Sequence, residues 1–285
     1  MLAIIGGTGL YKLPNLTQIE EIQMETPFGS PSSPIVKGVI HDAQVLFLSR
    51  HGTQHGLLPH EVNYAANLFA LKKAGAKAII SISAVGSLRE NYKPGDLVCM
   101  DQYLDMTKGN RRMSYFGSGV VAHIQSATPV SEVQRNLIIG ASKKIDMNRT
   151  LHATGTYACV EGPRLGTKAE SHMLRILGAD IVGMTNVPEV FLAREAQLAY
   201  SSIGVVTDYD SWMEDSTKHV AVDQIFKVYS ESIADVITLI ETCIDDYDAN
   251  STESCESRKS LQGSLLTQPE SLSNESRAWL STLLS

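Results

Sequence analysis

A glycine loop near the start of the chain, GGTG at residues 6–9, follows directly on the apolar run LAII. The run favours a buried strand. The loop would expose backbone N–H groups and the Thr8 hydroxyl, which suit a compact oxyanion such as phosphate. It breaks the dinucleotide pattern GxGxxG because Lys12 stands at the third glycine position, and no GK[ST] follows it. A tight turn without a ligand remains the alternative.

Arg50 and His51 open a second segment that could do chemistry, SRHGTQHGLLPHEVNYAAN. They follow a predicted strand, and α/β sheets bind ligands at the carboxyl ends of their strands. Arginine offers a planar fork of donors to an oxyanion, and histidine adds a donor or a proton. His51 and His55 stand four residues apart. We expect no metal site here, because the chain has no HExxH and Gly52 argues against a helix.

Small or soft side chains follow two further predicted strands. Ser83 and Ala84, in ISAVGSL, would let a ligand approach the backbone, although an ordinary strand exit fits as well. Met184 and Thr185 lie in GMTNVPE. Methionine offers an apolar, polarisable surface, and the threonine offers a hydroxyl at the start of a helix. Both pairs are therefore candidates for ligand contact.

Three carboxylates also follow predicted strands. Glu161 precedes the Gly-Pro turn of VEGPRLGTKAES, where it could meet a ligand or bind backbone N–H groups of the turn. Asp208 and Asp210 stand at i and i+2 in VVTDYDSW, and an extended backbone would point both the same way. One could hold a proton while the other accepts a hydrogen bond from an amine. Two solvated acids in a surface loop are the alternative.

The elements that must position these residues alternate between strand and helix. Apolar runs predict strands at residues 2–5, 45–48, 76–83, 151–160, 179–184 and 199–207. Apolar residues at helical spacing predict helices at residues 61–74, 132–145, 168–177, 189–196 and 222–243. The alternation predicts an α/β fold, a single domain with a central mixed, mostly parallel sheet flanked by helices.

The composition changes after residue 245. Ser, Thr, Asn, Asp and Glu dominate residues 246–273, which predicts a solvated linker between a domain at residues 1–245 and a short helix at 274–285. Asn274 is the expected N-cap of that helix. Its apolar residues should dock on the same domain or on a neighbouring subunit.

Charge and composition exclude several classes of protein. The formal net charge of -7 argues against a wide nucleic-acid surface. No apolar run approaches the roughly 20 residues that a bilayer span needs, and no secretory signal is visible before the first strand. The four cysteines form no CxxC pair, which favours reduced thiols in a cytoplasmic protein.

Eight short motifs follow one another in an order that is specific, although each alone is weak: IIGGTG, ETPFGSPS, RHG, VNYAAN, AVGSL, EGPR, GMTNVPE and TDYDSW. In this order they resemble the trimeric purine nucleoside phosphorylases, and more closely the 5′-methylthioadenosine phosphorylase branch. The resemblance runs to about residue 246. It implies phosphate-dependent cleavage of 5′-methylthioadenosine to adenine and 5-methylthioribose 1-phosphate by a homotrimer, with inorganic phosphate as co-substrate and no resident cofactor or metal.

The same resemblance implies a role for each candidate residue. Phosphate would be bound by Thr8, Arg50, His51, Ser83, Ala84 and Thr185. Met184 would lie under the ribose, and Leu165 would face the substrate. The methylthio group would meet apolar walls from Val222, Ile225 and Phe226, joined by Leu283 or Leu284 of the tail.

The two aspartates would decide the chemistry at the purine. The leaving purine accumulates negative charge, so Asp208 would act as a general acid, with His51 as the second catalytic residue beside phosphate. Asp210, as an anion, would accept a hydrogen bond from a 6-amino group and repel a 6-oxo group. The TDYD sequence therefore favours adenine, since the inosine and guanosine enzymes of the family carry Asn in this loop.

Two departures keep other substrates open. Leu165-Gly166 stands where the adenine-specific branch usually shows Phe-Ser, and Gly183 stands where it usually shows Asn. Both features are similar to bacterial methylthioinosine phosphorylases. The alternatives are therefore a 5′-methylthioinosine phosphorylase that releases hypoxanthine, or an inosine or guanosine phosphorylase.

Overall fold

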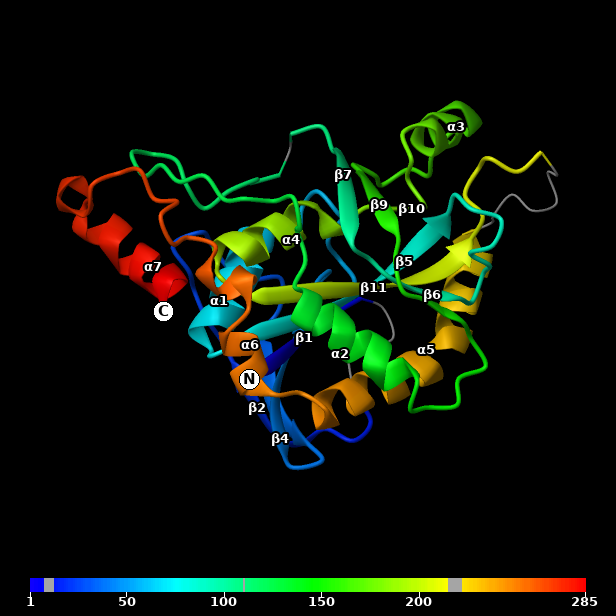
Figure 1. Cartoon of the computed structure of the whole chain (residues 1–285), viewed down its shortest axis with the longest axis horizontal. Helices are drawn as coiled ribbons and strands as arrows, with labels where there is room; N and C mark the ends of the chain where they lie inside the picture. Colours follow the sequence, from blue (N-terminus) through cyan, green and yellow to red (C-terminus); the bar gives the residue numbers. More distant parts are fainter. Residues whose placement is uncertain (8–12, 110, 215–221) are drawn as a thin grey trace.

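The computed structural model describes residues 1–7, 13–109, 111–214 and 222–285. These residues form a sheet of eleven strands with helices on both faces (Figure 1). The strands are β1 (Leu2–Gly6), β2 (Thr17–Ile22), β3 (Ile35–Ile40), β4 (Ala43–Ser49), β5 (Ala78–Ser87), β6 (Leu97–Cys99), β7 (Gln102–Met106), β8 (Leu151–His152), β9 (Thr156–Val160), β10 (Ile181–Gly183) and β11 (Ala199–Asp208). The helices are α1 (Tyr64–Lys73), α2 (Glu132–Ser142), α3 (Lys168–Ile176), α4 (Asn186–Glu195), α5 (Val222–Asp245), α6 (Ala249–Glu253), the short 3-10 turns η2 (Glu256–Lys259) and η3 (Pro269–Ser271), and α7 (Asn274–Leu284).

Four parallel strands form the centre of the sheet. β1 pairs with β4 and β5, and β11 pairs with β5 along nearly its whole length. The register sets Gly6 beside Ser49, and Asp208 beside Gly86. Parallel strands end at the same edge of a sheet, so the segments that follow β1, β4 and β11 meet there with the last third of β5.

The rest of the sheet is mixed. β10 runs antiparallel to β5 but parallel to β9, and β9 is parallel to β7. On the other side, β3 runs antiparallel to β4 and to β2. The predicted fold class, α/β with a mixed, mostly parallel sheet flanked by helices, is confirmed.

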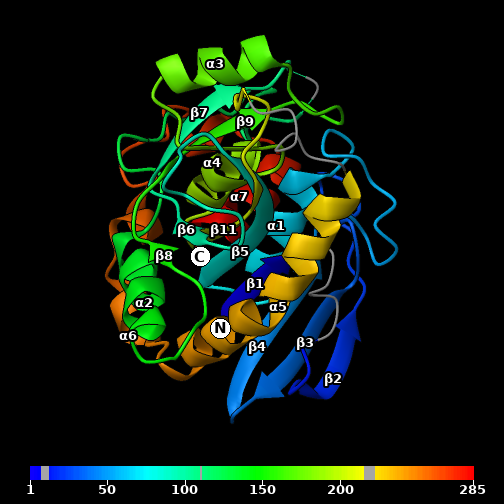
Figure 2. The ribbon, with the colours of Figure 1, turned by 90° about the vertical axis from the view of Figure 1, so that its right-hand side faces the viewer.

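Side-chain alternation along β1 shows how the two helical layers are built. Ala3 and Ile5 pack with residues of α1, α4 and α7, whereas Leu2 and Ile4 pack with residues of α2 and α5. Successive residues of a strand face opposite sides. Figures 1 and 2 show α1 and α4 on one face of the central strands, and α2 and α5 on the other.

The predicted elements recur with boundaries that are shifted by up to four residues. The helix predicted at 61–74 begins at Tyr64, because the Asn63 side chain caps it by accepting the N–H of Ala66. The strand predicted at 151–160 is two strands, β8 and β9, which pair with different neighbours. The strands β2, β3, β6 and β7 were not predicted. β6 has only three residues, and polar residues or glycine interrupt the apolar residues of the other three.

The prediction of a solvated linker at residues 246–273 is wrong in one respect. The segment forms α6, η2 and η3, and buries Cys255, Leu261 and Leu272 against the domain. Its polar residues bind the domain as well: the Ser260 hydroxyl donates to the carbonyl of Arg194. The composition of this segment wrongly indicated a solvated linker, because its few apolar residues are spaced far apart. The domain boundary at residue 245 stays a prediction.

The C-terminal helix α7 docks on its own chain. Trp279 packs edge-on to Phe28, with ring centroids 5.7 Å apart, and lies 6.2 Å from Phe116. Leu280 and Leu283 are buried in the same core. The N-cap is Ser273, whose hydroxyl accepts the N–H of Ser276, and not the expected Asn274.

All four cysteines are free and buried. Burial raises the pKa of the Cys99 thiol to about 11 and that of Cys159 to about 12, so both stay protonated near neutral pH. No helix in the described part of the chain is long and apolar enough to cross a membrane.

Candidate active site

A cavity of about 600 Å³ opens at the carboxyl edge of the central strands. Most of the candidate residues line it, together with Gly7, among them Arg50, His51, Ser83, Ala84, Leu165, Met184, Thr185, Asp208, Asp210 and Ile225. Thr8 and the Val222 side chain lie outside the described residues. The topology thus brings together side chains that are spread over more than 170 positions of the sequence.

Arg50 is held at the floor of this cavity by a partner that the sequence did not single out. Its Nε donates to Glu189 Oε2 at 2.7 Å, and its Nη2 to Glu189 Oε1 at 2.9 Å. Nη2 also donates to the Ser81 hydroxyl, and Nη1 to the carbonyl of Ile82. Burial alone would lower the pKa of Arg50, but the Glu189 carboxylate raises it well above its ordinary value. Arg50 is therefore always charged.

Most N–H donors of the Arg50 guanidinium are already used within the protein. A guanidinium has five N–H bonds, and four of those of Arg50 are used in the contacts with Glu189, Ser81 and Ile82. Among the described residues, one Nη1–H is left for a ligand. The fork expected to clasp an oxyanion is thus turned mainly to Glu189, and Arg50 can offer an oxyanion one strong donor.

His51 is oriented by the loop that follows it. Its Nδ1–H donates to the carbonyl of Leu57 at 2.9 Å. Burial, followed by the nearby Arg50 charge, lowers the pKa of His51 to about 4. The ring is therefore neutral near pH 7, and its Nε2 can accept a proton or a hydrogen bond. The His51 and His55 rings lie 4.6 Å apart, and the described residues contain no group of three or more metal-ligating side chains.

The loop between β10 and α4 is fixed by two buried residues that were not predicted. Asn186 accepts the Ser83 hydroxyl at 3.1 Å and donates to Tyr200. Arg111 donates from Nη1 to the carbonyls of Met184 and Val187, at 2.6 and 2.7 Å. Asn186 stood inside the GMTNVPE motif, whereas Arg111 lies in a polar stretch with no strand or helix pattern, which offered no signal.

Tyr157 explains the glycine at position 183. A Cβ at Gly183 would overlap the phenol ring and hydroxyl of Tyr157. The same hydroxyl accepts the backbone N–H of Thr185 at 3.1 Å. An asparagine at position 183, as in the adenine-specific branch, does not fit beside this tyrosine. Glycine at position 183 is therefore explained by packing against Tyr157, and it does not by itself indicate which purine the protein binds.

Asp208 ends β11 with both carboxylate oxygens occupied. Oδ1 accepts the Thr207 hydroxyl at 2.6 Å, and Oδ2 accepts the backbone N–H of Asp210 at 2.8 Å. Burial raises the pKa of Asp208 to about 6. This carboxyl can therefore hold a proton much closer to neutral pH than an exposed aspartate.

Asp210 does not continue the extended backbone, so the geometry expected for the i, i+2 pair is wrong. Its φ is +46°, in the left-handed region, and its carboxylate turns to α3, where Ser171 donates to Oδ2 at 2.5 Å. Burial raises the pKa of Asp210 above its ordinary value. Both aspartates still line one cavity, because the turn brings Asp210 back beside Asp208.

Glu161 lines the cavity, and both of its carboxylate oxygens accept hydrogen bonds from the protein. Its Oε2 accepts the backbone N–H of Lys108 at 2.6 Å, and its Oε1 accepts Arg111 Nε at 3.2 Å. Burial opposes ionisation, but these two bonds outweigh it and lower the pKa of Glu161. Of its two predicted readings, binding of backbone N–H groups is the one seen, although the backbone belongs to Lys108 and not to the Gly-Pro turn.

The walls of the cavity differ from prediction in the tail. Ile225 and Phe226 of α5 line the cavity, and Leu165 lies at its mouth with 43% of its surface exposed. Leu283 is instead buried in the core beside α1, and Leu284 is exposed. The expectation that one of these two leucines of the same chain would wall the pocket is wrong, because α7 docks on the α1 side of the molecule (Figure 1).

Several known proteins are similar to this chain over most of its length. The S-methyl-5'-thioadenosine phosphorylase of Thermofilum pendens is 48% identical over 243 residues, 85% of this chain and 90% of that protein. That of Geobacter sulfurreducens is 40% identical over 285 residues, 100% of this chain and 98% of that protein. A methylthioadenosine phosphorylase from an antarctic soil metagenomic library has a TM-score of 0.93 at 41% identity and covers 100% of this chain and 98% of its own.

A second solved structure is also similar to this chain, and a family model matches most of it. The methylthioadenosine phosphorylase of Schistosoma mansoni, in complex with adenine, has a TM-score of 0.87 at 34% identity, covering 94% of this chain and 99% of its own. The model of the phosphorylase superfamily matches residues 1–242, which include every described strand of the sheet. The chain belongs to the phosphorylase superfamily.

Proposed function

We propose that this chain cleaves 5′-methylthioadenosine with inorganic phosphate, giving adenine and 5-methylthioribose 1-phosphate. It is then a pentosyltransferase of purine and methionine salvage. The observation that carries the proposal is one cavity with two kinds of group: Arg50 and His51, which follow β4, and the two aspartates, Asp208 at the end of β11 and Asp210 in the turn after it. Full-length similarity to methylthioadenosine phosphorylases supports it.

Phosphate binding would use one charge and several neutral donors. Arg50 would supply its remaining Nη1–H. The hydroxyls of Ser83 and Thr185 line the same cavity, and Ser83 would turn its proton from Asn186 Oδ1 to the phosphate. His51, neutral with Nε2 unprotonated, would accept the P–OH proton of phosphate. Phosphate held beside the anomeric carbon would stabilise the oxocarbenium-like transition state and then capture it, an effect of positioning and electrostatics.

The purine would leave through Asp208. The C–N bond that breaks leaves its electron pair on the base, and a protonated carboxyl at N7 neutralises that charge. Asp208 has the raised pKa that this role needs, because it is buried. Asp210, ionised, would accept a hydrogen bond from the 6-amino group and so favour adenine.

One assay tests the proposal. Equal amounts of 5′-methylthioadenosine and 5′-methylthioinosine are incubated with the protein, with and without phosphate, and the freed base is measured. Adenine release that needs phosphate and exceeds hypoxanthine release supports the proposed function. Preferred release of hypoxanthine would assign the methylthioinosine activity instead, and release of neither base would remove the proposed reaction.

We also propose a cytoplasmic homotrimer, as the trimeric members of the family suggest. Val121 and Leu266 are exposed apolar residues on adjoining segments, joined where Leu266 N–H donates to the carbonyl of Val121. A solution mass three times the chain mass of 31.0 kDa, measured by light scattering, is the expected result. A mass of one chain would contradict it, and cell fractionation tests the compartment.

A further inference from the structure

Ser171 lies against Asp210, the carboxylate to which the proposed function gives the 6-position of the purine. It is the fourth residue of α3 and is fully buried, and its Oγ lies 2.5 Å from Asp210 Oδ2. Both residues line the cavity. The sequence did not single Ser171 out, because a serine in the first turn of a helix is common.

The Ser171 hydroxyl has two possible acceptors but only one proton. Its Oγ also lies 3.0 Å from the carbonyl oxygen of Thr167. If Asp210 is ionised, the hydroxyl donates to Asp210. If Asp210 is protonated, the carboxyl can donate to Ser171, which then donates to Thr167. The Thr167 carbonyl already accepts the Ser171 backbone N–H at 2.9 Å, so the helix does not require the hydroxyl.

The other ionisable groups around Asp210 oppose its ionisation, so the hydrogen bond from the Ser171 hydroxyl matters for its charge. Burial raises the pKa of Asp210, and the Ser171 hydroxyl and the backbone N–H of Ser211 lower it. The ionisable groups that act on it are Asp208 from β11 and Glu170 from α3, both acids that oppose another negative charge. A donated hydrogen bond favours the charged form of a carboxylate. Ser171 is the side chain that gives one.

We propose that Ser171 sets the preference for a 6-amino purine by holding Asp210 ionised, which makes it a positioning residue for specificity. The inference rests on the proposed function. An ionised Asp210 keeps Oδ1 as an acceptor for a 6-amino group. A protonated Asp210 could instead donate to a 6-oxo group, so the proton on this carboxyl decides which purine fits.

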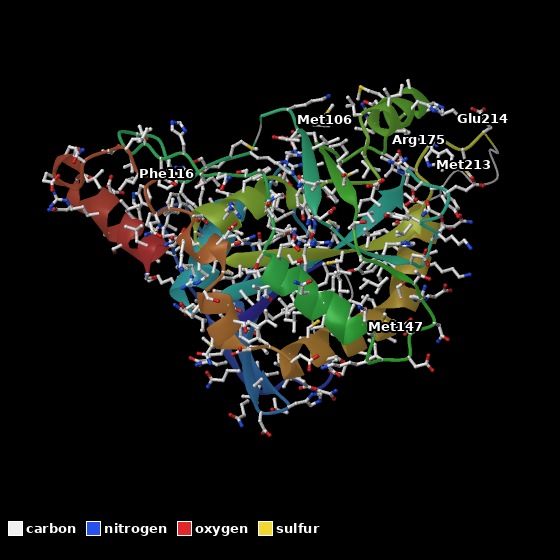
Figure 3. All side chains as sticks on the ribbon, in the orientation of Figure 1. Met106, Phe116, Met147, Arg175, Met213 and Glu214 are labelled. Atoms are coloured by element: carbon white, nitrogen blue, oxygen red, sulfur yellow. The ribbon has the colours of Figure 1, made fainter. Side chains whose placement is uncertain are left out.

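The contact between α3 and the turn after β11, which carries Asp210, does not depend on Ser171 alone. The Ser211 hydroxyl donates to the carbonyl of Gly166 at 2.9 Å. The Arg175 guanidinium lies 3.7 Å from the centre of the Trp212 ring. Figure 3 shows the labelled Arg175 and Met213 at the same end of the molecule. Ser171→Ala should therefore change the proton balance at Asp210 while leaving the turn in place, and Ser211→Ala is a matched control.

The experiment measures the ratio of kcat/KM for 5′-methylthioadenosine over 5′-methylthioinosine, from about pH 5 to 8, for the unaltered protein and each variant. Ser171→Ala should lower the ratio about tenfold near pH 7, the usual effect of losing a hydrogen bond to a charged group. The pH below which the ratio falls should move upward. Ser171→Cys, a weaker donor of similar size, should give an intermediate ratio, and Ser211→Ala should change neither quantity.

Two results would overturn the inference. One is a Ser171→Ala protein with the ratio and pH dependence of the unaltered protein. The other is an equal fall in Ser211→Ala, which would assign the effect to the position of the turn and not to a proton. Failure of the proposed function itself would look different, because the unaltered protein would then release no base from either nucleoside.

Discussion

Arg50 and Glu189 form a buried, two-pronged ion pair between residues 139 positions apart in the sequence. Both side chains are at most 2% exposed. Ser81 and Tyr200 donate to the same Glu189 oxygen, at 2.6 and 2.9 Å. The pair joins the end of β4 to α4. It therefore orients Arg50, the candidate phosphate-binding residue, and also holds two elements of the fold together.

Glu189→Ala should destabilise the protein by about 3–5 kcal/mol, because it leaves a buried guanidinium without its partner. Urea unfolding followed by circular dichroism measures the change. Arg164→Ala is the control, since the Arg164–Glu170 pair also has two hydrogen bonds, from Nη1 and Nη2, but lies on the surface. A small change is expected there. Equal effects of the two variants would mean that the buried pair adds no stability of its own.

Asp208→Asn should make the protein more stable near pH 7 while it lowers activity. The folded-state pKa of about 6 lies above the value of 3.8 that an unperturbed aspartate has. The native state therefore binds the proton more tightly, and stability falls as pH rises from about 4 to about 6. Since a shift of one unit corresponds to about 1.4 kcal/mol, the stability lost is of the order of 3 kcal/mol. Asparagine avoids that loss.

The same variant tests the chemical role of Asp208. Loss of a general acid costs about a hundredfold to ten-thousandfold in rate. The limb of the pH profile of kcat/KM that falls as pH rises through about 6 should disappear with it. A variant that keeps its rate would contradict the role, even if its unfolding curve moves as expected.

Asp210→Asn should shift the preference toward the 6-oxo purine. An amide can donate to O6 as well as accept from a 6-amino group, so the repulsion between an anion and O6 is lost. We expect the ratio of kcat/KM for 5′-methylthioadenosine over 5′-methylthioinosine to fall at least tenfold, as for other losses of a charged hydrogen-bonding partner. An unchanged ratio would remove Asp210 from specificity.

The sequence could predict which strand ends carry chemistry, but not the groups that hold those residues. Arg50 and Asp208 follow apolar runs, and a parallel sheet brings such ends to one edge. Glu189, Asn186 and Arg111 act over 73 to 139 positions, and nothing in their local pattern indicates a partner. The strands β2, β3, β6 and β7 were not predicted for a related reason, since their pairing partners and not their own periodicity define them.

Gly183→Ala should destabilise the protein by about 1–3 kcal/mol, because the added methyl group meets the Tyr157 ring and hydroxyl in a packed site. Tyr157→Phe removes the nearest atom, so the double variant should be less destabilised than the sum of the two single variants. Chemical denaturation of all four proteins measures this coupling. Additive effects would show that Tyr157 is not what requires glycine at position 183.

Trp279→Ala should cost about 3–5 kcal/mol, the usual range for a large aromatic side chain removed from a core. Trp279 packs against Phe28 and Phe116, and it anchors a helix that composition alone would leave loosely tethered. Leu284→Ala, at an exposed position of the same helix, is the control and should change little. Because α7 of this chain does not line the cavity, the folded Trp279→Ala protein should keep its KM for nucleoside. A raised KM at unchanged oligomeric state would instead connect α7 to the substrate.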